Sequence, residues 1–361
     1  MDFALNVPIN DVSFGQVSVA LLKEVHSRGL QPSIFPISKV SISTQTNLSD
    51  DFKSWMDSCI DKAVRSHSRS TPIFKLWHLQ GSLESHSKEQ VLLTFYELDQ
   101  PTKEEINIAK NNRTCFTSEY SCNIYKDVGV ESSYIPLGFD SHNFHRVDRK
   151  YYDDDRIVFN LVGKFEKRKN HQKVIESWLK KYGNDPRYFL NCAVYNPFFT
   201  ESQNKSIWNA VLKGKDYFNV HFFNYFDNNA NYNDFLNSGH IVISASGGEG
   251  WGLPEFQSVA MGKHSLTLNA TGYKGWANDK NSVLMYPTSK EEAYDNQFFK
   301  KGGNYNQGNV FWFDEEDFFE GCDEVIDRYK KNNINEEGLK LQEQFTYSKT
   351  LDKIIEELEK V

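Results

Sequence analysis

Residues Ile241–Gly262 constrain the fold more than any other stretch of the chain. They begin with the β-branched run Ile241–Ser244, which is typical of a buried parallel strand. Four glycines follow within the six positions Gly247–Gly252, and they let the backbone approach a ligand closely. A helix is predicted from Pro254, because proline suits the first helical position. This order predicts an α/β domain with an anion site where a strand ends and a helix begins.

The same alternation of strand, loop and helix recurs along both halves of the chain. Strands are predicted at residues 3–7, 33–37, 73–79, 91–96 and 113–118, and again at 156–162, 188–194, 219–223, 241–244 and 264–268. Repeated βα units predict parallel sheets with helices on both faces. Because 361 residues exceed one compact core, we expect two domains.

Composition excludes several classes of protein. With 25% charged and 39% hydrophobic residues, the chain is expected to be globular and not disordered. No apolar run approaches the roughly 20 residues of a membrane span, and the N-terminal residues do not resemble a secretory signal. The five cysteines form no CxxC pair, which indicates reduced thiols in a cytoplasmic protein and no zinc site. The net charge of −8 disfavours nonspecific nucleic-acid binding over the whole surface.

The run Glu249–Pro254 resembles the donor-site signature EGFGLPxxE of retaining glycosyltransferases of the GT-B fold, family 4 (glycosyl transferases group 1). The second acid of that signature usually binds the nucleotide ribose. This chain has Gln257 at that position, with Glu255 two residues earlier. The Gln257 amide can hydrogen-bond hydroxyls but carries no charge. Taken without further matches, the same loop fits an ordinary βα turn with a solvated Glu249.

A second match lies in the basic loop after the strand predicted at 156–162. Gly163–Asn170 resembles the family's GRxxxxKG/N segment, in which an Arg and a Lys grip the donor diphosphate. Lys164 stands at the Arg position and Lys169 at the Lys position. Lysine keeps the point charge but lacks the bidentate fork of arginine. Arg168 adds a spare cation, and a solvated basic loop is the alternative interpretation.

Three further segments match the family in order along the chain. Ser133–Asp140 resembles the segment that closes the N-terminal domain before the hinge. Asn224–Phe226 falls in the loop that binds the nucleotide base, mainly through backbone groups. Thr271-Gly272 partly matches a small-residue turn near the phosphates. In the N-terminal domain, family members place a glycine close to the donor phosphates, and Gly15 is the candidate here.

Polar residues follow two predicted strands of the first half. Ligands of open α/β sheets bind outside the carboxyl ends of strands, so His78, Glu97 and Asp99 are predicted to line the acceptor side of a cleft. Phe95–Pro101 is similar to an FExD-P pattern of some family members, which makes Glu97 a sugar-binding or acceptor-binding candidate. The alternatives are an acid at a helix start for Glu97 and a packed or solvated histidine for His78.

The resemblance implies an α/β fold with two Rossmann-like domains that face each other across a cleft (GT-B). The implied N-terminal, acceptor-side domain spans residues 1–150, and the nucleotide-sugar donor domain spans 156–335. Residues 336–361 are implied to form a helical segment that crosses back to the N-terminal domain. The amphipathic stripe over residues 351–358 fits this last segment.

The residues that the resemblance assigns fall into three groups. The catalytic candidates are Glu249, Lys169 and Lys164. The donor-binding candidates are Gly15, Gly163, Lys164, Lys169, Asn224, Tyr225, Phe226, Gly248, Glu249, Gly250, Trp251, Gly252, Leu253 and Gln257. The acceptor-side candidates are Glu97, Asp99 and His78.

The implied reaction moves a sugar from a nucleotide-sugar donor to a hydroxyl acceptor, which is a glycan, a lipid-linked glycan or a protein, with the anomeric configuration retained. Lysines, loop amides and a helix start can stabilise the leaving diphosphate, so neither a metal nor another cofactor is expected. The transition state is oxocarbenium-like, and Glu249 would hold sugar hydroxyls and favour its positive charge.

Two alternatives stay open. A DNA glycosyltransferase acting on hydroxymethylated bases would need a basic groove over the N-terminal domain. The net charge of −8 disfavours such a groove. A nucleotide-sugar-binding protein without turnover would explain Gln257 and Lys164. No transmembrane segment is predicted, while peripheral membrane contact is left open. The donor nucleotide, the acceptor and the oligomeric state are not encoded in any motif.

Overall fold

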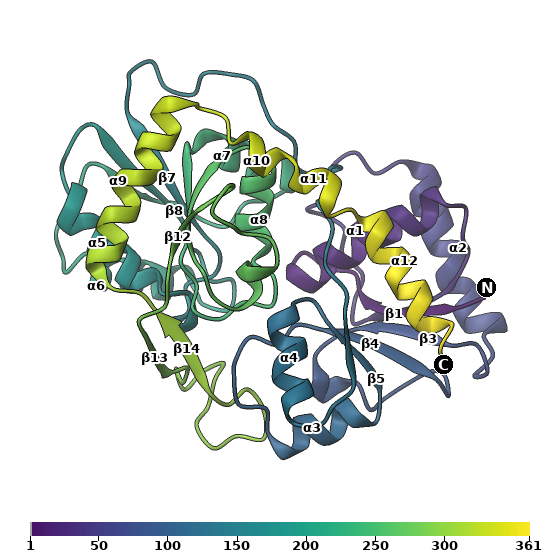
Figure 1. The fold of residues 1–361 in the computed structure, drawn as a ribbon. Coiled ribbons are helices and arrows are strands. Elements are labelled where there is room, and N and C mark those ends of the chain that lie inside the picture. Colours follow the sequence, from purple (N-terminus) through teal and green to yellow (C-terminus); the bar gives the residue numbers. More distant parts are fainter. Residues whose placement is uncertain (1) are drawn as a thin grey trace. The chain divides into compact units, whose positions relative to one another are not determined.

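The computed structural model describes residues 2–361 and contains two six-stranded sheets whose strands all run parallel (Figure 1). Each sheet belongs to one of two compact units. The N-terminal unit comprises the residues up to Asn143, residues 302–307 and Gln342–Val361. The C-terminal unit comprises Phe144–Lys301 and Gly308–Leu341. The predicted fold class, with two Rossmann-like domains, is confirmed.

The sheet of the N-terminal unit has the strand order β2-β1-β3-β4-β5-β6. Its strands are β1 (Ala4–Pro8), β2 (Ser33–Ile37), β3 (Ile73–Leu76), β4 (Gln90–Thr94), β5 (Arg113–Phe116) and β6 (Ser132–Tyr134). Its helices are α1 (Ser13–Ser27), α2 (Asp50–Ser66), the 3₁₀ turn η1 (Leu79–Gly81), α3 (Lys103–Lys110), α4 (Glu119–Asp127) and α12 (Tyr347–Leu358). β1, β3 and β4 are buried along their whole length, as strands covered on both faces are.

The terminal helix α12 packs on α1, as the resemblance implied. Arg28 on α1 donates from Nη1 to Asp352 Oδ1 at 2.6 Å. Thr350 Oγ1 donates to the carbonyl of Pro136 at 2.8 Å. The Thr346 side chain caps the helix by accepting from the Lys349 N–H at 3.1 Å. These contacts tie the last residues of the chain to the N-terminal unit.

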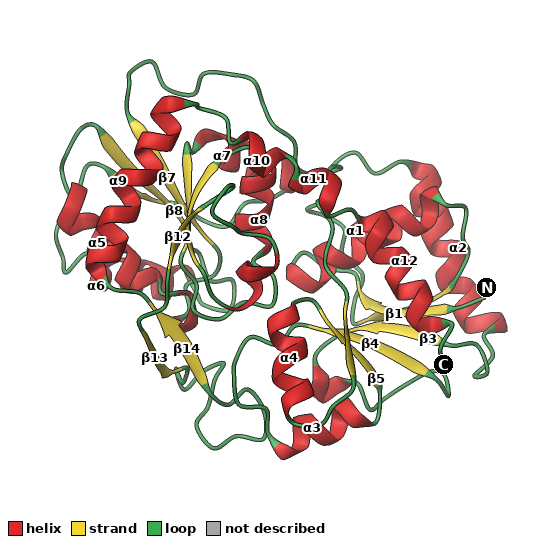
Figure 2. Cartoon of the chain, viewed as in Figure 1, coloured by secondary structure: helices red, strands yellow, loops and turns green. Residues whose placement is uncertain are grey.

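The sheet of the C-terminal unit has the order β12-β11-β10-β7-β8-β9. Figure 2 shows its strands in yellow with helices in red around them. Its strands are β7 (Ile157–Val162), β8 (Tyr188–Ala193), β9 (Val220–Phe222), β10 (Ile241–Ser244), β11 (His264–Leu268) and β12 (Val283–Met285). Its helical elements are η2 (Lys167–Lys169), α5 (His171–Tyr182), α6 (Glu201–Val211), α7 (Asn229–Ser238), α8 (Leu253–Ala260), η3 (Thr271–Gly275), α9 (Glu315–Lys331) and α10 (Glu336–Leu339). The short helix α11 (Leu341–Gln344) leads from this unit into the last segment.

Burial in the core of the C-terminal unit explains why these segments form its strands and helices. β7 and β10 are buried at every position, and they occupy the middle of the sheet. Trp178 on α5 is fully buried among the apolar residues that cover one face of the strands. α9 carries acidic residues in its first turn and basic residues in its last turn, which complements the helix dipole.

Residues 281–310, for which no motif predicts a role, contain β12 and most of an antiparallel hairpin. The hairpin pairs β13 (Ser289–Glu292) with β14 (Asn309–Trp312). Residues 302–307, between its strands, belong to the N-terminal unit. There Thr102 Oγ1 donates to the Asn304 carbonyl at 2.6 Å, and the Asn306 N–H donates to Glu105 Oε1 at 2.9 Å.

Candidate functional site

Three loops of the C-terminal unit meet at the carboxyl edge of its sheet. They follow β7, β10 and β11, which are neighbours in the strand order β11-β10-β7. The loops are residues 163–170, 245–252 and 269–270, the last running into η3. In open parallel sheets this edge is where ligands bind. The two motifs singled out from the sequence, at 163–170 and 246–252, therefore lie side by side.

Backbone contacts hold the glycine loop against its neighbours. The Gly247 N–H donates to the Arg168 carbonyl at 2.8 Å, and the Gly247 carbonyl accepts from the Phe311 N–H at 3.0 Å. A Cβ atom at Gly247 would lie 2.1 Å from the Phe311 carbonyl oxygen, which is closer than any side chain allows. The hairpin strand β14 is therefore part of the framework of this loop, and glycine is required at 247.

Two helices begin at this edge without a capping side chain. α8 starts after Gly252, whose φ of 81° is the left-handed conformation that favours glycine, and Pro254 lies in its first turn, as predicted. α5 starts after Asn170, which has a φ of 57° and uses its amide to donate to the carbonyls of Ala245 and Phe311. The first N–H groups of a helix lack intrahelical partners, and the dipole there is positive. Such starts favour a bound anion.

A buried network of charges joins the two motif loops; we call it the ionic network. Its members are Lys164, Glu166, Arg168, Lys169 and Glu249. Lys164 Nζ lies 2.7 Å from Glu166 Oε1, and Arg168 Nε lies 2.8 Å from Glu166 Oε2. Arg168 Nη1 lies 3.1 Å from Glu249 Oε1, which also accepts from Lys169 Nζ. The side chain of Lys164 is 33% exposed, while the other four are at most 8% exposed.

The network fixes the charge of its two carboxylates. Burial by itself would raise the pKa of Glu166, but Arg168 and Lys164 outweigh it and lower that pKa to about 2. Burial likewise opposes ionisation of Glu249, and Lys169 and Arg168 more than compensate, so its pKa is lowered. Burial by itself would lower the pKa of Lys169, but the carboxylates Glu249, Glu255 and Glu166 together raise it. Three cations and two carboxylates therefore leave this edge with a net positive charge.

A third acid lies behind the network on α8. Glu255 is 2% exposed, and its Oε1 accepts from the Tyr273 hydroxyl at 3.0 Å. Among residues 2–361, its Oε2 has no hydrogen-bond partner, and the same is true of Gln257 Oε1. Burial raises the pKa of Glu255 to about 7; Lys169 opposes this shift and Glu249 adds to it. Glu255 is thus the one acid of the three whose charge changes near neutral pH.

The remaining donor-side candidates of the C-terminal unit lie along the same edge or beneath it. Asn224 and Tyr225 follow β9 and are exposed, whereas Phe226 packs on Phe223 and Phe235. The Trp251 indole is 1% exposed, so a ligand contact at this position would come from its backbone. The Glu249 N–H donates to Thr271 Oγ1 at 3.0 Å, which brings the small-residue turn against the glycine loop.

The candidates of the N-terminal unit lie at the carboxyl edge of its own sheet. His78 follows β3 and is exposed, while Glu97 and Asp99 follow β4 and are partly exposed. Gly15 lies in the first turn of α1, where a Cβ atom would come 2.1 Å from the Asn10 carbonyl oxygen. The β1–α1 loop itself therefore requires a glycine at position 15.

Sequence reasoning missed Glu166 and treated Arg168 as a spare cation. In the structure Arg168 is 6% exposed and bridges Glu166 to Glu249, so it is the centre of the network. The signal in the sequence was the spacing of Lys164, Glu166 and Arg168 two residues apart. The contribution of Phe311 had no signal, because it depends on a hairpin that comes about 60 residues after the glycine loop in the chain.

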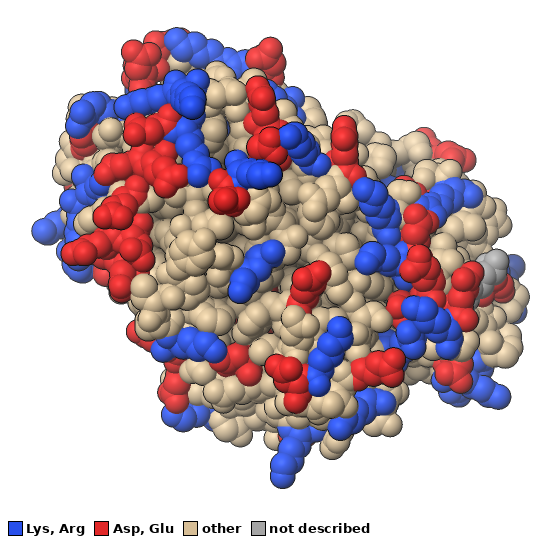
Figure 3. Space-filling view, in the orientation of Figure 1, with Lys and Arg blue, Asp and Glu red and all other residues tan. Residues whose placement is uncertain are grey.

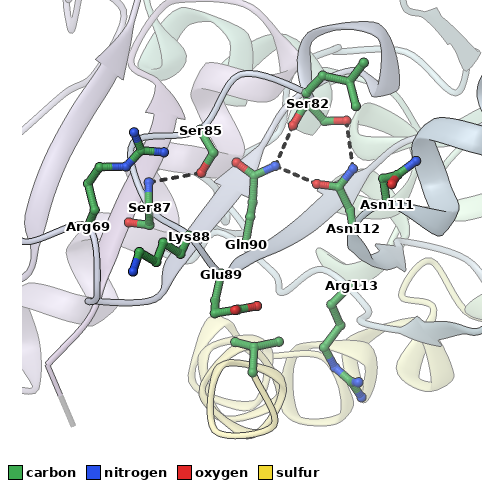
Figure 4. Close-up of a pocket in the computed structure, with 12 residues that line it drawn as sticks. Arg69, Ser82, Ser85, Ser87, Lys88, Glu89, Gln90, Asn111, Asn112 and Arg113 are labelled. Atoms are coloured by element: carbon green, nitrogen blue, oxygen red, sulfur yellow. Dashed lines mark hydrogen bonds between the residues drawn. The ribbon is translucent and has the colours of Figure 1, made fainter.

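The polar pocket drawn in Figure 4 is a separate feature. It has a volume of about 410 Å³ and lies in the N-terminal unit, where Gln90 and Arg113 begin β4 and β5. Its amides largely satisfy one another: Gln90 Nε2 donates to the Ser82 carbonyl at 2.6 Å and to Asn112 Oδ1 at 2.7 Å. None of the residues predicted for the site lines it.

Among residues 2–361, no three His, Cys, Asp or Glu side chains are grouped as a metal site would require. No helix within the same residues combines the length and the apolar character needed to traverse a bilayer. The five cysteines are buried and make no disulfide in this range.

The two parallel sheets and the terminal helix that returns to the first unit define the GT-B fold of glycosyltransferases. Among solved structures, the chain is similar to sucrose-phosphate synthase from Thermosynechococcus elongatus, with a TM-score of 0.67, 12% identity and 99% of each chain covered. It is also similar to HepE of Anabaena in complex with UDP and glucose, with a TM-score of 0.66, 11% identity and 100% of each chain covered.

The catalytic domain of starch synthase IV from Arabidopsis thaliana, bound to ADP and acarbose, gives a TM-score of 0.68 at 9% identity, with 100% of this chain and 99% of that chain covered. At these identities the likeness is one of fold. No protein-family model matches the sequence, and no curated protein matches it.

Proposed function

We propose that the protein is a retaining glycosyltransferase that moves a sugar from a nucleotide-sugar donor to a hydroxyl acceptor. The observation that carries this proposal is the ionic network, because it gathers Lys164, Arg168 and Lys169 beside the starts of α5 and α8. Cations and helix starts at one edge are what a leaving diphosphate needs. No metal is required for that stabilisation.

The proposed donor binds by exchanging partners within the network. In the structure, Lys169 pairs with Glu249. An incoming diphosphate competes for the Lys169 ammonium and for the N–H groups at the start of α8. The Glu249 carboxylate then keeps its bond to Arg168 Nη1, at 3.1 Å, and gains acceptor capacity for sugar hydroxyls. Arg168 acts here as a positioning residue for Glu249.

Charge balance favours the proposed transition state. As the glycosidic bond breaks, negative charge grows on the diphosphate and positive charge grows on the sugar ring. Lys164 and Lys169 stabilise the negative charge, and the Glu249 carboxylate, still paired with Arg168, stabilises the positive charge. These groups are fixed before the reaction, so they do not have to reorient in the transition state. Gln257 and Glu255 remain the proposed partners of the ribose hydroxyls.

The similar structures support a nucleoside diphosphate as the leaving group. HepE is described in complex with UDP and glucose, and starch synthase IV with ADP and acarbose. The two differ in their base, so the proposal leaves the choice between uridine and adenosine donors open. The exposed Asn224 and Tyr225 are the residues proposed to lie beside the base.

The test compares donor binding and turnover in the wild type and in Glu249→Gln. A panel of UDP-, GDP- and ADP-sugars is screened by thermal shift, since a ligand that binds the folded state raises its stability. The donor that binds is then assayed for hydrolysis and transfer. We expect Glu249→Gln to retain donor binding and lose turnover. Lys215→Gln, an exposed charge in the same unit, serves as the matched control.

Two outcomes would overturn the proposal. If no donor in the panel stabilises the wild type, the site does not bind nucleotide sugars. If a donor binds but is neither hydrolysed nor transferred to any acceptor, the protein is a nucleotide-sugar-binding protein without turnover, which was the alternative left open by Gln257 and Lys164.

A further inference from the structure

Four aromatic side chains cluster at the carboxyl edge of the N-terminal sheet; we call them the aromatic platform. They are Phe14, Trp77, His78 and Phe95. The Phe14 ring centroid lies 4.6 Å from those of both His78 and Phe95, and 5.6 Å from that of Trp77. Trp77 and His78 are 5.2 Å apart. His78 is exposed and the other three are partly exposed, so the cluster is not part of the core.

The sheet topology explains why these rings meet. Trp77 and His78 directly follow β3, Phe95 directly follows β4, and Phe14 begins α1 after the loop that follows β1. The strands β1, β3 and β4 are neighbours in the sheet and run parallel. Their carboxyl ends therefore converge, and the four rings occupy the ligand-binding edge of this sheet.

The Trp77 indole is positioned by the turn that follows it. η1 brings Gly81 against one edge of the ring, where a Cβ atom would lie 2.5 Å from Trp77 Cδ1 and 2.7 Å from Nε1. The backbone N–H of Trp77 also donates to the Leu93 carbonyl at 3.3 Å, which ties the residue to β4. An indole that is held at its edge and is partly exposed offers a flat apolar ring to a ligand.

The groups around the aromatic platform favour a neutral, hydroxyl-rich ligand. Gln80 and Glu97 lie on the same loops as Trp77 and Phe95, and amide and carboxylate oxygens accept hydrogen bonds from hydroxyls. A pyranose ring combines an apolar face of C–H groups with a rim of hydroxyls. That combination matches flat aromatic side chains bordered by polar ones.

The charged residues on the loops at this edge disfavour a polyanionic ligand. The loops after β1 to β5 (residues 9–12, 38–49, 77–81, 95–102 and 117–118) contain Asp11, Glu97 and Asp99 but a single cation, Lys39. Nucleic-acid binding depends on Lys and Arg contacts to phosphate. On the face of the molecule drawn in Figure 3, both blue and red side chains are present, and uncharged residues cover much of the surface between them.

A lipid surface fits this edge no better than DNA does. Membrane-binding faces combine a continuous apolar area with flanking cations. Here the exposed Gln80 and the partly exposed Glu97 interrupt the apolar area, and cations are scarce on these loops.

We propose that the aromatic platform binds the acceptor of the transfer reaction and that this acceptor is a neutral saccharide, stacked on Trp77 and bonded through its hydroxyls to the polar groups beside it. This inference rests on the proposed function, and it narrows the acceptor from any hydroxyl compound to an uncharged sugar chain.

The test uses the full chain and measures two responses separately. Saturation-transfer NMR reports binding of maltotriose, cellotriose and chitotriose, and a thermal shift reports binding of the nucleotide sugar. We expect at least one trisaccharide to bind the wild type, and Trp77→Ala to weaken that binding about tenfold while the donor-induced shift is retained. His78→Ala removes an exposed ring and serves as the variant that preserves the fold. Phe218→Ala, an aromatic of the C-terminal unit that is 55% exposed, is the matched control.

Several outcomes would overturn this inference. The platform is not the binding site if Trp77→Ala and His78→Ala bind trisaccharide as well as the wild type and Phe218→Ala do. A wild type that binds none of the trisaccharides at millimolar concentration also contradicts it. Binding of a DNA oligonucleotide that is lost in Trp77→Ala would assign the site to nucleic acid. Failure of the donor to bind would instead count against the proposed function, because the saccharide measurement does not depend on it.

Discussion

The two sheets of this protein have the same six-stranded parallel architecture but carry opposite chemistry at their carboxyl edges. At the edge of the C-terminal sheet, Lys169, Arg168 and Glu249 form buried ion pairs next to two helix starts. At the edge of the N-terminal sheet, Trp77 and Phe95 offer partly exposed rings with few cations nearby. The same backbone plan thus provides one edge suited to a charged diphosphate and one suited to an uncharged ring.

The comparison also shows why the charged edge is buried and the aromatic edge is not. Ion pairs gain strength as water is excluded, and buried charges are tolerated only when they are paired. Aromatic stacking needs an accessible face. The carboxylates of the network are therefore paired within the protein, whereas the rings of the aromatic platform keep accessible surface.

The largest expected effect comes from breaking the charged edge. Lys169→Met removes the cation that pairs with Glu249 and is proposed to meet the diphosphate. We expect donor turnover to fall on the order of 10²–10³-fold, as when one preorganised stabilising group is removed from an active site. Initial rates of donor hydrolysis give the measurement, with Lys215→Gln as the control. Wild-type rates in Lys169→Met would show that the network is structural only.

The next effect concerns the backbone that shapes the charged edge. Gly252 has a φ of 81°, and a Cβ atom there would lie 2.2 Å from Tyr273 Cε1. Gly214 has a φ of 67° but nothing within 4 Å. We expect Gly252→Ala to lower the free energy of unfolding by about 3 kcal/mol, from backbone strain and overpacking together, and Gly214→Ala by about 1 kcal/mol from strain alone. Urea unfolding curves measure both, and equal losses would contradict the tight packing at Gly252.

A pH-dependent effect separates Glu255 from the other two acids of the charged edge. Burial raises its pKa from 4.5 to about 7, so the folded state holds a proton that the unfolded state releases between these values. The contribution of this bound proton to the free energy of unfolding is fully present below pH 4.5 and is lost as the pH rises through 7. Relative to the wild type, Glu255→Gln should therefore become more stable from pH 5 to pH 8, by about 2–3 kcal/mol.

Unfolding curves of the wild type and Glu255→Gln at a series of pH values measure this difference. Gln at 255 can still accept the Tyr273 hydroxyl bond, so the packing is preserved. A difference in stability that does not vary between pH 5 and pH 8 would mean that Glu255 does not titrate there.

The smallest expected effect comes from Gly81→Ala. This substitution tests whether Gly81 acts by positioning Trp77 at the aromatic edge. A Cβ atom at Gly81 would displace the indole, so Gly81→Ala should weaken trisaccharide binding a few-fold and lower stability by about 1 kcal/mol. In a Trp77→Ala background the same substitution should change saccharide binding no further, because its target is gone. Equal and independent losses in the double variant would place the effect of Gly81 elsewhere.

Much of the fold could be predicted from local sequence signals. The run Ile241–Pro254 predicted a strand, a glycine loop and a helix start, because β-branched residues, glycine and proline each restrict or permit particular backbone angles. The amphipathic stripe over 351–358 agreed with a terminal helix that packs on an apolar neighbour. Residues 281–310 gave no such signal, since the strands of their hairpin are short and β13 is exposed at every position.

The candidate site divides in the same way. The sequence nominated Lys164, Lys169 and Glu249 through the resemblance of their motifs, and these assignments remain predictions for the donor assay to test. It gave no reason to join Arg168 to Glu249, or Phe14 to Trp77. Those pairs are brought together by strands that are neighbours in a sheet but distant in the chain.

The sequence alone therefore determined the alternation of strands and helices, the division into two parallel sheets and the positions of the two donor-side loops, because these follow from backbone preferences over a few neighbouring residues. Only the tertiary structure decided that the lysines of one loop pair with the glutamate of another, that β14 supports the glycine loop, and that four rings share one edge of the N-terminal sheet. Long-range pairing depends on strand order and on the burial that decides which charges must find partners, and neither is encoded in any single stretch of the chain.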